Sequence, residues 1–343
     1  MNNNESFGVE SCSLHNQSRT CLSNTKQLNN IKLVKGSLSH IELNNSTINI
    51  SGDNSYGVYS NGNGSSIDLN NLNLNVDKET SSGFALYNGN ININNSHIES
   101  KGIGFISQGN SVVTINNSNI NSKGNLINSS KGFTLNSNNS SINGNIKQKN
   151  EFNFNLIKST YSGSINSTGL IVLNNSKLYL NNNSSVNKIN SNNGMISLSN
   201  NNMTLNVNEL YGNNTFNLNV NGMKGNFINI KKNTKGINTI SIKSNSNKSS
   251  DNYHIAHAMN SKDNTFRLKD GYARLGIYKY NLERIYNDWY LNQFALINSA
   301  EKVLNTYSLQ LVALSTDLDD RRFRYGSLAQ NQIGFWFDNQ YKK

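Results

Sequence analysis

The stretch Ile41-Glu42-Leu43-Asn44-Asn45-Ser46-Thr47-Ile48 sets the pattern of this chain. Its order, a short apolar alternation, an Asn pair and a further apolar residue, returns at residues 91–98, 113–120 and 171–178 and more loosely at 67–72, 138–142 and 196–200. The Asn pairs begin at positions 44, 70, 94, 116 and 138, in steps of 26, 24, 22 and 22. Such self-similarity at a fixed period is typical of a solenoid, and the unit here is about two dozen residues.

Each unit reads as three short strands and three turns. Apolar residues alternate with polar ones at a period of two, which places Ile, Leu and Val on one face of a strand. An Asn-Asn-Ser turn follows, and a second alternation leads to a Gly-plus-aromatic segment, as at 57–59, 83–87 and 104–106. One unit cannot bury its apolar face alone, so stacked units and a continuous narrow core are expected.

The sequence therefore predicts an all-β chain, a right-handed parallel β-helix. Asn suits its corners, because Asn tolerates left-handed backbone angles and its amide can bond to the coil above. Low hydrophobicity alternatively suggests disorder, but the regular alternation favours a solenoid through residue 240. From Asn138 to Asn174 the spacing stretches to 36, which predicts an insertion or irregular coil near Lys147 to Tyr161.

Composition supports two unlike parts. Only 35% of the chain is hydrophobic and 15% is charged, below the usual globular shares of about 45–50% and 25%. The chain has 73 Asn, 63 of them within residues 1–250, and no proline. A domain boundary is therefore expected near residue 250, and the absence of proline permits long strand ladders.

The net charge and the two cysteines do not identify a function. The net charge is +11, but the lysines are scattered, and the only tight basic cluster is Arg321, Arg322 and Arg324. Nucleic-acid binding is not expected, because no aromatic residues are interleaved in the way that base stacking needs. Cys12 and Cys21 either close a small N-terminal loop or remain two free thiols.

No catalytic, cofactor-binding or metal-binding residues are expected. A catalytic β-helix needs carboxylates gathered on one face, and the acidic residues of the repeats look isolated and out of phase with them. These are Glu42, Asp53, Asp68, Asp77, Glu79, Glu99, Glu151 and Glu209. His254 and His257 lie three apart, a spacing that would suggest a metal on a helix, but surface polar residues are the simpler interpretation.

After residue 250 the composition changes, and aromatic strands appear. Residues 276–282 read G-x-Y-x-Y-x-L, and residues 289–291 read W-Y-L. This region resembles the C-terminal end of a pertactin-like passenger of a classical autotransporter. Aromatic-dense strands bury much area per residue and would form a stable cap. The resemblance implies an autochaperone role for a cap at 251–292, carried by Phe266, Gly276, Tyr278, Tyr280, Leu282, Trp289, Tyr290 and Leu291.

A helix is predicted next, over residues 293–320. Apolar residues recur at steps of three and four, at Leu296, Ala300, Val303, Leu304, Tyr307, Leu311, Leu314 and Leu318. Its polar residues exclude exposure to lipid, so a membrane-crossing helix would lie inside a barrel, as the linker of the family does. Alternatively it is a capping helix on the solenoid end. Asn305 falls where some family members cleave themselves, but they use Asn-Asn and this chain has Asn305-Thr306.

Residues 321–343 resemble the opening of a translocator barrel, with Ala329 where the family pattern has its third Arg. The chain is thus expected to be truncated at the barrel, after an N-terminal segment at 1–29, capping or disordered, and a β-helix passenger at 30–250. No signal peptide is readable in Met1 to Thr25. Localisation at the cell surface or outer membrane, or secretion, is expected if the full gene supplies a signal peptide and barrel.

The expected function is that of a non-enzymatic surface passenger, adhesive or virulence-related. The implied partners are the outer-membrane translocator barrel, its assembly machinery and a host surface or matrix receptor. No cofactor is expected. Two alternatives remain open, a carbohydrate-active β-helix such as a polysaccharide lyase or depolymerase, and a structural surface-layer protein.

Overall fold

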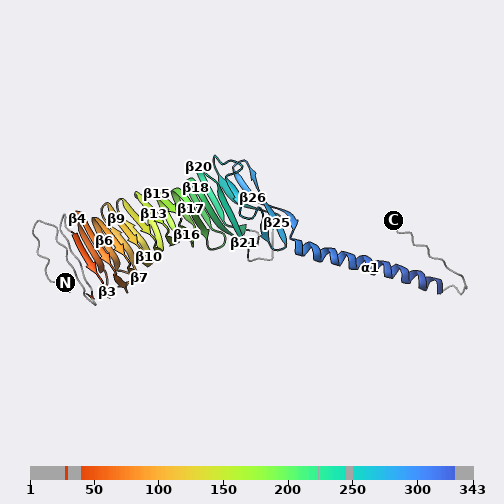
Figure 1. Ribbon diagram of the computed structural model, residues 1–343, viewed down its shortest axis with the longest axis horizontal. Helices are drawn as coiled ribbons and strands as arrows, with labels where there is room; N and C mark the ends of the chain where they lie inside the picture. The colour runs from red at the N-terminus through yellow and green to blue at the C-terminus, as the bar shows by residue number, and fades with distance from the viewer. Residues whose placement is uncertain (1–27, 30–39, 223, 245–249, 329–343) are drawn as a thin grey trace, which may run out of the picture.

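The structure, a computed structural model, describes residues 28–29, 40–222, 224–244 and 250–328. These residues form a parallel β-solenoid of about nine turns that continues into one helix (Figure 1). The predicted parallel β-helix is therefore confirmed. The predictions for Cys12 and Cys21, and for residues 329–343 of the expected barrel opening, lie outside the described residues.

The strands of the first coils are β1 (Leu28–Asn29), β2 (His40–Asn44), β3 (Thr47–Ile50), β4 (Tyr56–Asn70), β5 (Asn73–Val76), β6 (Ser82–Asn94), β7 (His97–Ser100), β8 (Ile103–Ser107), β9 (Ser111–Asn116), β10 (Asn119–Ser129), β11 (Phe133–Asn138) and β12 (Ser141–Gln148). The later coils contain β13 (Phe152–Ile157), β14 (Thr160–Gly163), β15 (Ile165–Asn174), β16 (Lys177–Leu180), β17 (Ser184–Leu198), β18 (Thr204–Asn221), β19 (Lys224–Gly225), β20 (Phe227–Lys235), β21 (Asn238–Ser244), β22 (Asn252–Ala258) and β23 (Phe266–Leu268). The cap adds β24 (Ala273–Leu275), β25 (Tyr278–Ile285) and β26 (Asp288–Leu296), and the helix is α1 (Asn298–Leu328).

Equivalent apolar residues of successive coils stack in register. The parallel pairings place each one over its counterpart in the coil before, and the side chains are almost completely buried. One such column contains Ile67, Ile91, Val113, Leu135, Phe154, Ile171, Ile189 and Leu210. The period-two alternation thus becomes columns of buried side chains that run through the core from coil to coil.

In the Asn-Asn-Ser corner, the second Asn and the Ser have different structural roles. The second Asn has a left-handed backbone, with φ of 47° at Asn45, 49° at Asn95 and 48° at Asn117, a conformation that Asn adopts more readily than most residues. The buried Ser accepts a hydrogen bond from the backbone of the preceding coil, as where the Ser96 N–H donates to Ser118 Oγ at 2.9 Å. These three residues therefore supply both a turn and a buried hydrogen bond between neighbouring coils.

The predicted irregular coil between Asn138 and Asn174 is absent from the structure. Residues 152–163 form a regular coil, in which β13 pairs with β11 and β14 pairs with β12 in parallel register. The corner has Ile157-Lys158-Ser159 in place of Asn-Asn-Ser, and Lys158 has a φ of 48°. The 36-residue spacing was thus two coils whose shared corner lacks the Asn signature. The insertion prediction was wrong because the backbone, not the side chain, defines the repeat.

Replacing Lys158 by Asn is expected to stabilise the solenoid by about 0.5–1 kcal/mol. Asn adopts the left-handed region at lower cost than Lys. The new amide would also lie between Asn139 and Asn175, each already hydrogen-bonded to a counterpart in a neighbouring coil. Chemical denaturation measures the change, and Lys158→Ala is the control that removes the charge without the Asn preference. A Lys158→Asn variant no more stable than Lys158→Ala would contradict this explanation.

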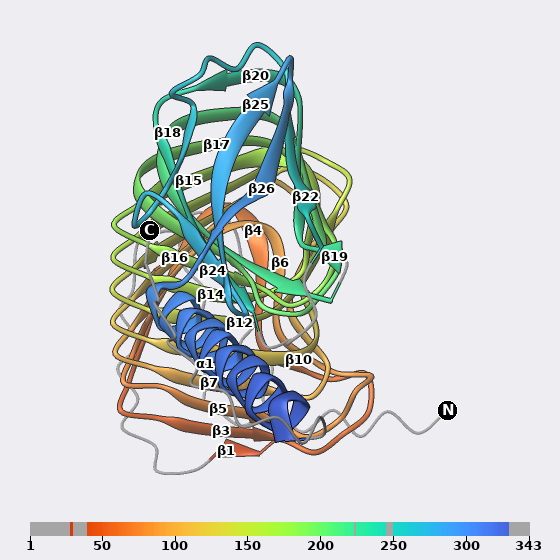
Figure 2. The same cartoon turned by 90° about the vertical axis from the view of Figure 1, so that its right-hand side faces the viewer.

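The solenoid ends where strand pairing changes from parallel to antiparallel. β22 pairs in parallel with β20 on one side and antiparallel with β26 on the other, and β24, β25 and β26 pair antiparallel in sequence. Viewed along the rod, β25 and β26 lie across the end of the stacked coils (Figure 2). An antiparallel cap cannot template another parallel coil, so it closes this end.

The helix differs from its predicted range. It begins at Asn298 rather than at residue 293, because Gln293, Ala295 and Leu296 pair with β25. It continues to Leu328, so residues 321–328, expected at the opening of the barrel, are helical. Residues 301–318 are all exposed, and the helix extends away from the rod (Figure 1). It is therefore not the capping helix that was the alternative interpretation.

Candidate functional site

The sequence-predicted cap residues lie together at the C-terminal end of the solenoid core. Tyr280, Trp289 and Leu291 are buried, and Phe266 is 3% exposed. The ring of Trp289 packs edge-on against Phe266 at 5.2 Å, and Phe266 packs against Phe216, two coils earlier, at 6.2 Å. These contacts continue the solenoid core into the cap without a break.

The buried polar tips of the cap are hydrogen-bonded to the chain before it. The Tyr280 hydroxyl donates to the Ser250 carbonyl at 2.6 Å, and Trp289 Nε1 donates to Ser261 Oγ at 3.4 Å. Gly276 has a φ of 59° in the turn between β24 and β25, where glycine avoids the strain of a side chain. The hydrogen-bonded rings of Tyr280 and Trp289, together with the turn at Gly276, therefore fix the orientation of the cap on the last coil.

The remaining predicted cap residues lie at its margin. Tyr278 and Leu282 are partly buried and pack against the core. Tyr290 is also partly exposed, and its ring stacks on His254 at 4.7 Å. All eight predicted cap residues thus fall in β23, β25, β26 or the turn at Gly276, although their autochaperone role stays a prediction.

A β-bulge brings His254 and His257 to the same carboxylate. In the pairing of β22 with β26 the register shifts between His254 and Ala256. The bulge places His254 and His257 on the same face, whereas a regular strand would place two residues three apart on opposite faces. His254 Nε2 lies 2.9 Å and His257 Nδ1 2.8 Å from Asp288 Oδ1. Sequence reasoning missed Asp288, because only the antiparallel pairing places it opposite β22.

The environment of Asp288 favours its ionised form. Burial alone would raise the pKa of this carboxyl group, and it is the largest single influence. The hydrogen bonds from His257 and His254, together with the charge of both rings, outweigh it and lower the pKa of Asp288 below its ordinary value of 3.8. The three side chains therefore form a charged clasp between the last coil and the cap, called here the His–Asp clasp.

Replacing Asp288 by Asn is expected to lower the unfolding temperature at neutral pH, and the difference from the parent should vanish in acid. A carboxylate whose folded pKa is depressed contributes stability above its unfolded pKa, near 3.8, and loses it as pH falls through the folded value. Thermal unfolding at about pH 7 and about pH 2.5 measures both differences. Asp263→Asn is the control, since Asp263 is 93% exposed in its pair with Arg284. A gap that persists in acid would contradict a charge-based clasp.

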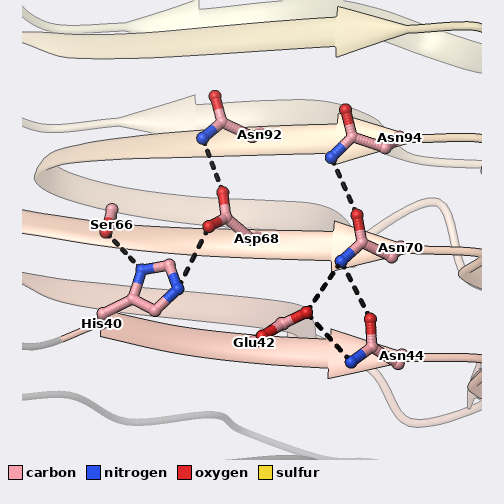
Figure 3. A network of polar contacts seen from close by, with 8 residues as sticks. All are labelled: His40, Glu42, Asn44, Ser66, Asp68, Asn70, Asn92 and Asn94. Atoms are coloured by element: carbon pink, nitrogen blue, oxygen red, sulfur yellow. Dashed lines mark hydrogen bonds and ion pairs between the residues drawn. The ribbon is translucent and has the colours of Figure 1, made fainter. Parts of the chain in front are cut away.

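The acidic residues near the N-terminal end follow the repeat, contrary to the sequence prediction. Glu42 and Asp68 are register partners in β2 and β4. Figure 3 shows both at the ends of stacked Asn side chains. Asn94 donates to Asn70 and Asn70 to Asn44, each at 2.8 Å, while Asn44 and Asn70 also donate to Glu42.

These carboxylates terminate the amide ladders. Each ladder amide donates toward the preceding coil, so the N-terminal end of a ladder needs an acceptor. Asp68 accepts from Asn92 at 2.6 Å, and in another column Glu99 accepts from Asn121 at 2.7 Å. The prediction that the acidic residues are out of phase was wrong for Glu42 and Asp68, because coils of 26, 24 and 22 residues keep register in space while drifting in sequence number.

The same network contains Ser66, His40 and Asp68 in contact. His40 Nδ1 lies 2.7 Å from Ser66 Oγ, and His40 Nε2 lies 3.1 Å from Asp68 Oδ2. Acyl transfer also needs donors aimed at the developing oxyanion. Here Ser66 lies within a strand paired with β2 and β6, and strand N–H groups point along the sheet rather than outward. The contacts are therefore those of a polar surface network.

Within the described ranges, no group of three or more His, Cys, Asp or Glu side chains is arranged to hold a metal ion. In the His–Asp clasp both imidazoles bond the same carboxylate oxygen instead of converging on a separate point. No described helix is long and apolar enough to cross a membrane. Asn305 is exposed on α1, and its cleavage stays a prediction.

Comparison with known proteins finds a matching family model and similar solved structures. Residues 168–293 match the Pertactin family model. The crystal structure of the Haemophilus influenzae Hap adhesin aligns with 14% sequence identity and a TM-score of 0.37, over 78% of this chain and 33% of that one. No curated protein matches the sequence. Residues 168–293, which contain the last coils and nearly all of the aromatic cap, are therefore a pertactin-like region.

Proposed function

We propose that this chain is an autotransporter passenger that is displayed at the bacterial surface and acts in adhesion. The observation that carries this is the Pertactin match over residues 168–293, which contain the antiparallel cap where the parallel solenoid ends. A long polar rod also suits adhesion, since it offers extended lateral faces. The chain spans a third of the Hap adhesin structure, so the activity of the whole protein belongs to this proposal.

The cap acts as the folding nucleus in this scheme. Its buried rings contact one another within residues 250–296, as where Phe266 packs on Trp289 and Tyr253 on Tyr280, so the cap can become ordered as one unit. Each coil then adds to an edge that is already ordered, because coils contact only their neighbours. The eight predicted cap residues thus act in folding rather than in recognition.

The helix α1 is the proposed connection to an outer-membrane translocator barrel. With 31 residues it is about 46 Å long, more than the roughly 30 Å of a bilayer core. Its apolar residues Leu304, Leu311 and Leu318 are exposed, and they alternate with Asn, Ser and Glu, which lipid would not accommodate. A protein pore supplies partners for both kinds of side chain. The general barrel-assembly machinery would insert that pore.

The proposed activity is binding and not catalysis. The carboxylates that stack in the first coils are bonded to Asn amides, an arrangement that leaves them as structural acceptors. The passenger would be located at the cell surface, or be released from it after secretion, and its contacts would be with host surface or matrix molecules.

The test is display of this chain between a cleavable export signal and the translocator of an unrelated autotransporter. We expect a folded, protease-resistant passenger on the outside of a Gram-negative host, and increased attachment of those cells to epithelial monolayers. The matched control carries the same signal and translocator without residues 28–296. A passenger that stays inside the cell, or that is displayed without any gain in attachment over the control, would refute the proposal.

A further inference from the structure

Four lysines on a lateral face of the solenoid lie in the two strands that flank Tyr211. Lys188 lies in β17, Tyr211 in β18, and Lys231, Lys232 and Lys235 in β20. The pairings put Asn190 beside Tyr211 and Tyr211 beside Lys235, so Tyr211 lies between the coils that carry the lysines. These five residues are called the lysine face.

The ring of Tyr211 holds two of the ammonium groups in place. Lys188 Nζ lies 4.6 Å and Lys235 Nζ 6.0 Å from the ring centroid. Attraction between a cation and the ring fixes long side chains that would otherwise move freely. The ring therefore orders two positive charges from the coils on either side of it, whose backbones are about 10 Å apart, or two strand spacings.

A bulge projects the other two lysines. Between Val207 and Glu209 strand β18 advances by two residues, while its partner β20 advances from Ile230 to Asn233. Lys231 and Lys232 occupy this bulge, and both are exposed. The turn after β22 holds the bulge, because Asn260 Nδ2 donates to the Lys232 carbonyl at 2.9 Å and to Asn233 Oδ1 at 3.1 Å.

The face carries an excess of positive charge. Glu209 is the register partner of Lys188, and its carboxylate lies 3.5 Å from Lys188 Nζ. Lys231, Lys232 and Lys235 are exposed in the strand on the other side of Glu209, so this part of the surface has four ammonium groups and one carboxylate. A concentration of one sign of charge on a regular surface attracts polyanions.

We propose that the lysine face binds a sulfated polysaccharide. Several fixed cations on neighbouring coils suit a chain that carries sulfates along its length. A nucleic acid fits less well, since single-strand recognition relies on several rings for stacking and the one ring here already contacts Lys188. The inference rests on the proposed surface location and adds to it the chemical class of one ligand.

The test is binding of the purified full chain to immobilised heparin in about 0.15 M salt. Replacing Lys188, Lys231, Lys232 and Lys235 together by Gln is expected to weaken binding by at least about tenfold and to flatten its salt dependence. The matched control removes the same charge from exposed, dispersed positions, with Lys123, Lys177, Lys243 and Lys269 replaced by Gln. It is expected to lose no more than about threefold, because distant charges are screened.

Desulfated heparin and double-stranded DNA complete the design. Support requires that desulfated heparin binds at least about tenfold more weakly than heparin, and that DNA binding falls equally in both variants. Equal losses of heparin binding in the two variants, or DNA binding as tight as heparin binding and equally dependent on the lysine face, would overturn the proposal.

Thermal unfolding of both variants verifies that they are folded. Failure of surface display would leave this binding result intact, and absence of heparin binding would leave display intact.

Discussion

A chain lacking residues 264–291 is expected to lose the ability to refold its solenoid, whereas a chain ending at residue 297 should refold like the parent. The first deletion removes Phe266, Tyr280 and Trp289, and it leaves Phe216 and Tyr253 without the rings that pack on them. The second removes α1 and the residues after it, and residues 301–318 of α1 are all exposed. Loss of a nucleus slows folding more than it speeds unfolding.

Recovery of the far-UV circular dichroism signal after dilution from denaturant measures this effect. We expect the refolding rate of the cap-deleted chain to fall by at least about tenfold. The single substitution Trp289→Ala should act in the same direction and cost about 3–5 kcal/mol, while Phe294→Ala, at a side chain that is 56% exposed in the same strand, should cost little. Equal recovery rates with and without the cap would remove the folding role assigned to it.

Replacing Phe105 by Ala is expected to destabilise the solenoid by about 3–5 kcal/mol. The Phe105 ring is fully buried. It stacks on Phe84 of the preceding coil at 4.8 Å and packs against Phe133 of the next at 6.2 Å. Each coil contacts only its two neighbours, so this change weakens both interfaces of one coil at once.

Denaturant titration followed by circular dichroism measures the Phe105→Ala effect. Phe105→Leu is the matched control, which keeps most of the volume and should cost less than about 1.5 kcal/mol. A solenoid weakened at one level is also expected to unfold over a broader range of denaturant, because its two halves become less coupled. A change of under about 1 kcal/mol for Phe105→Ala would show that the aromatic stack does not carry the core.

The candidate site was only partly readable from sequence. The aromatic cap was predicted because its aromatic residues are concentrated in two short segments of the sequence, one with Tyr280 and the next with Trp289. The His–Asp clasp was not, since His257 and Asp288 are 31 residues apart and the bulge that aligns the two histidines leaves no mark in composition. Recurrence at one-coil spacing was the available signal for the lysine face, with Lys188, Tyr211 and Lys235 about one repeat apart.

The sequence by itself determined the solenoid. Alternating Ile and Leu fix which side chains are buried, and the second Asn of each pair supplies the left-handed corner, as at Asn95 and Asn117. Both are local properties repeated in every coil, so they can be read without the fold.

Only the tertiary structure decided what the coils bring together. Lys158 takes the corner conformation of Asn because the coils on either side impose it, and Glu42 stacks with Asp68 because parallel register aligns coils of unequal length. The cap likewise depends on β26 turning antiparallel against β22. Contacts of this kind are set by stacking along the axis, which sequence separation does not encode.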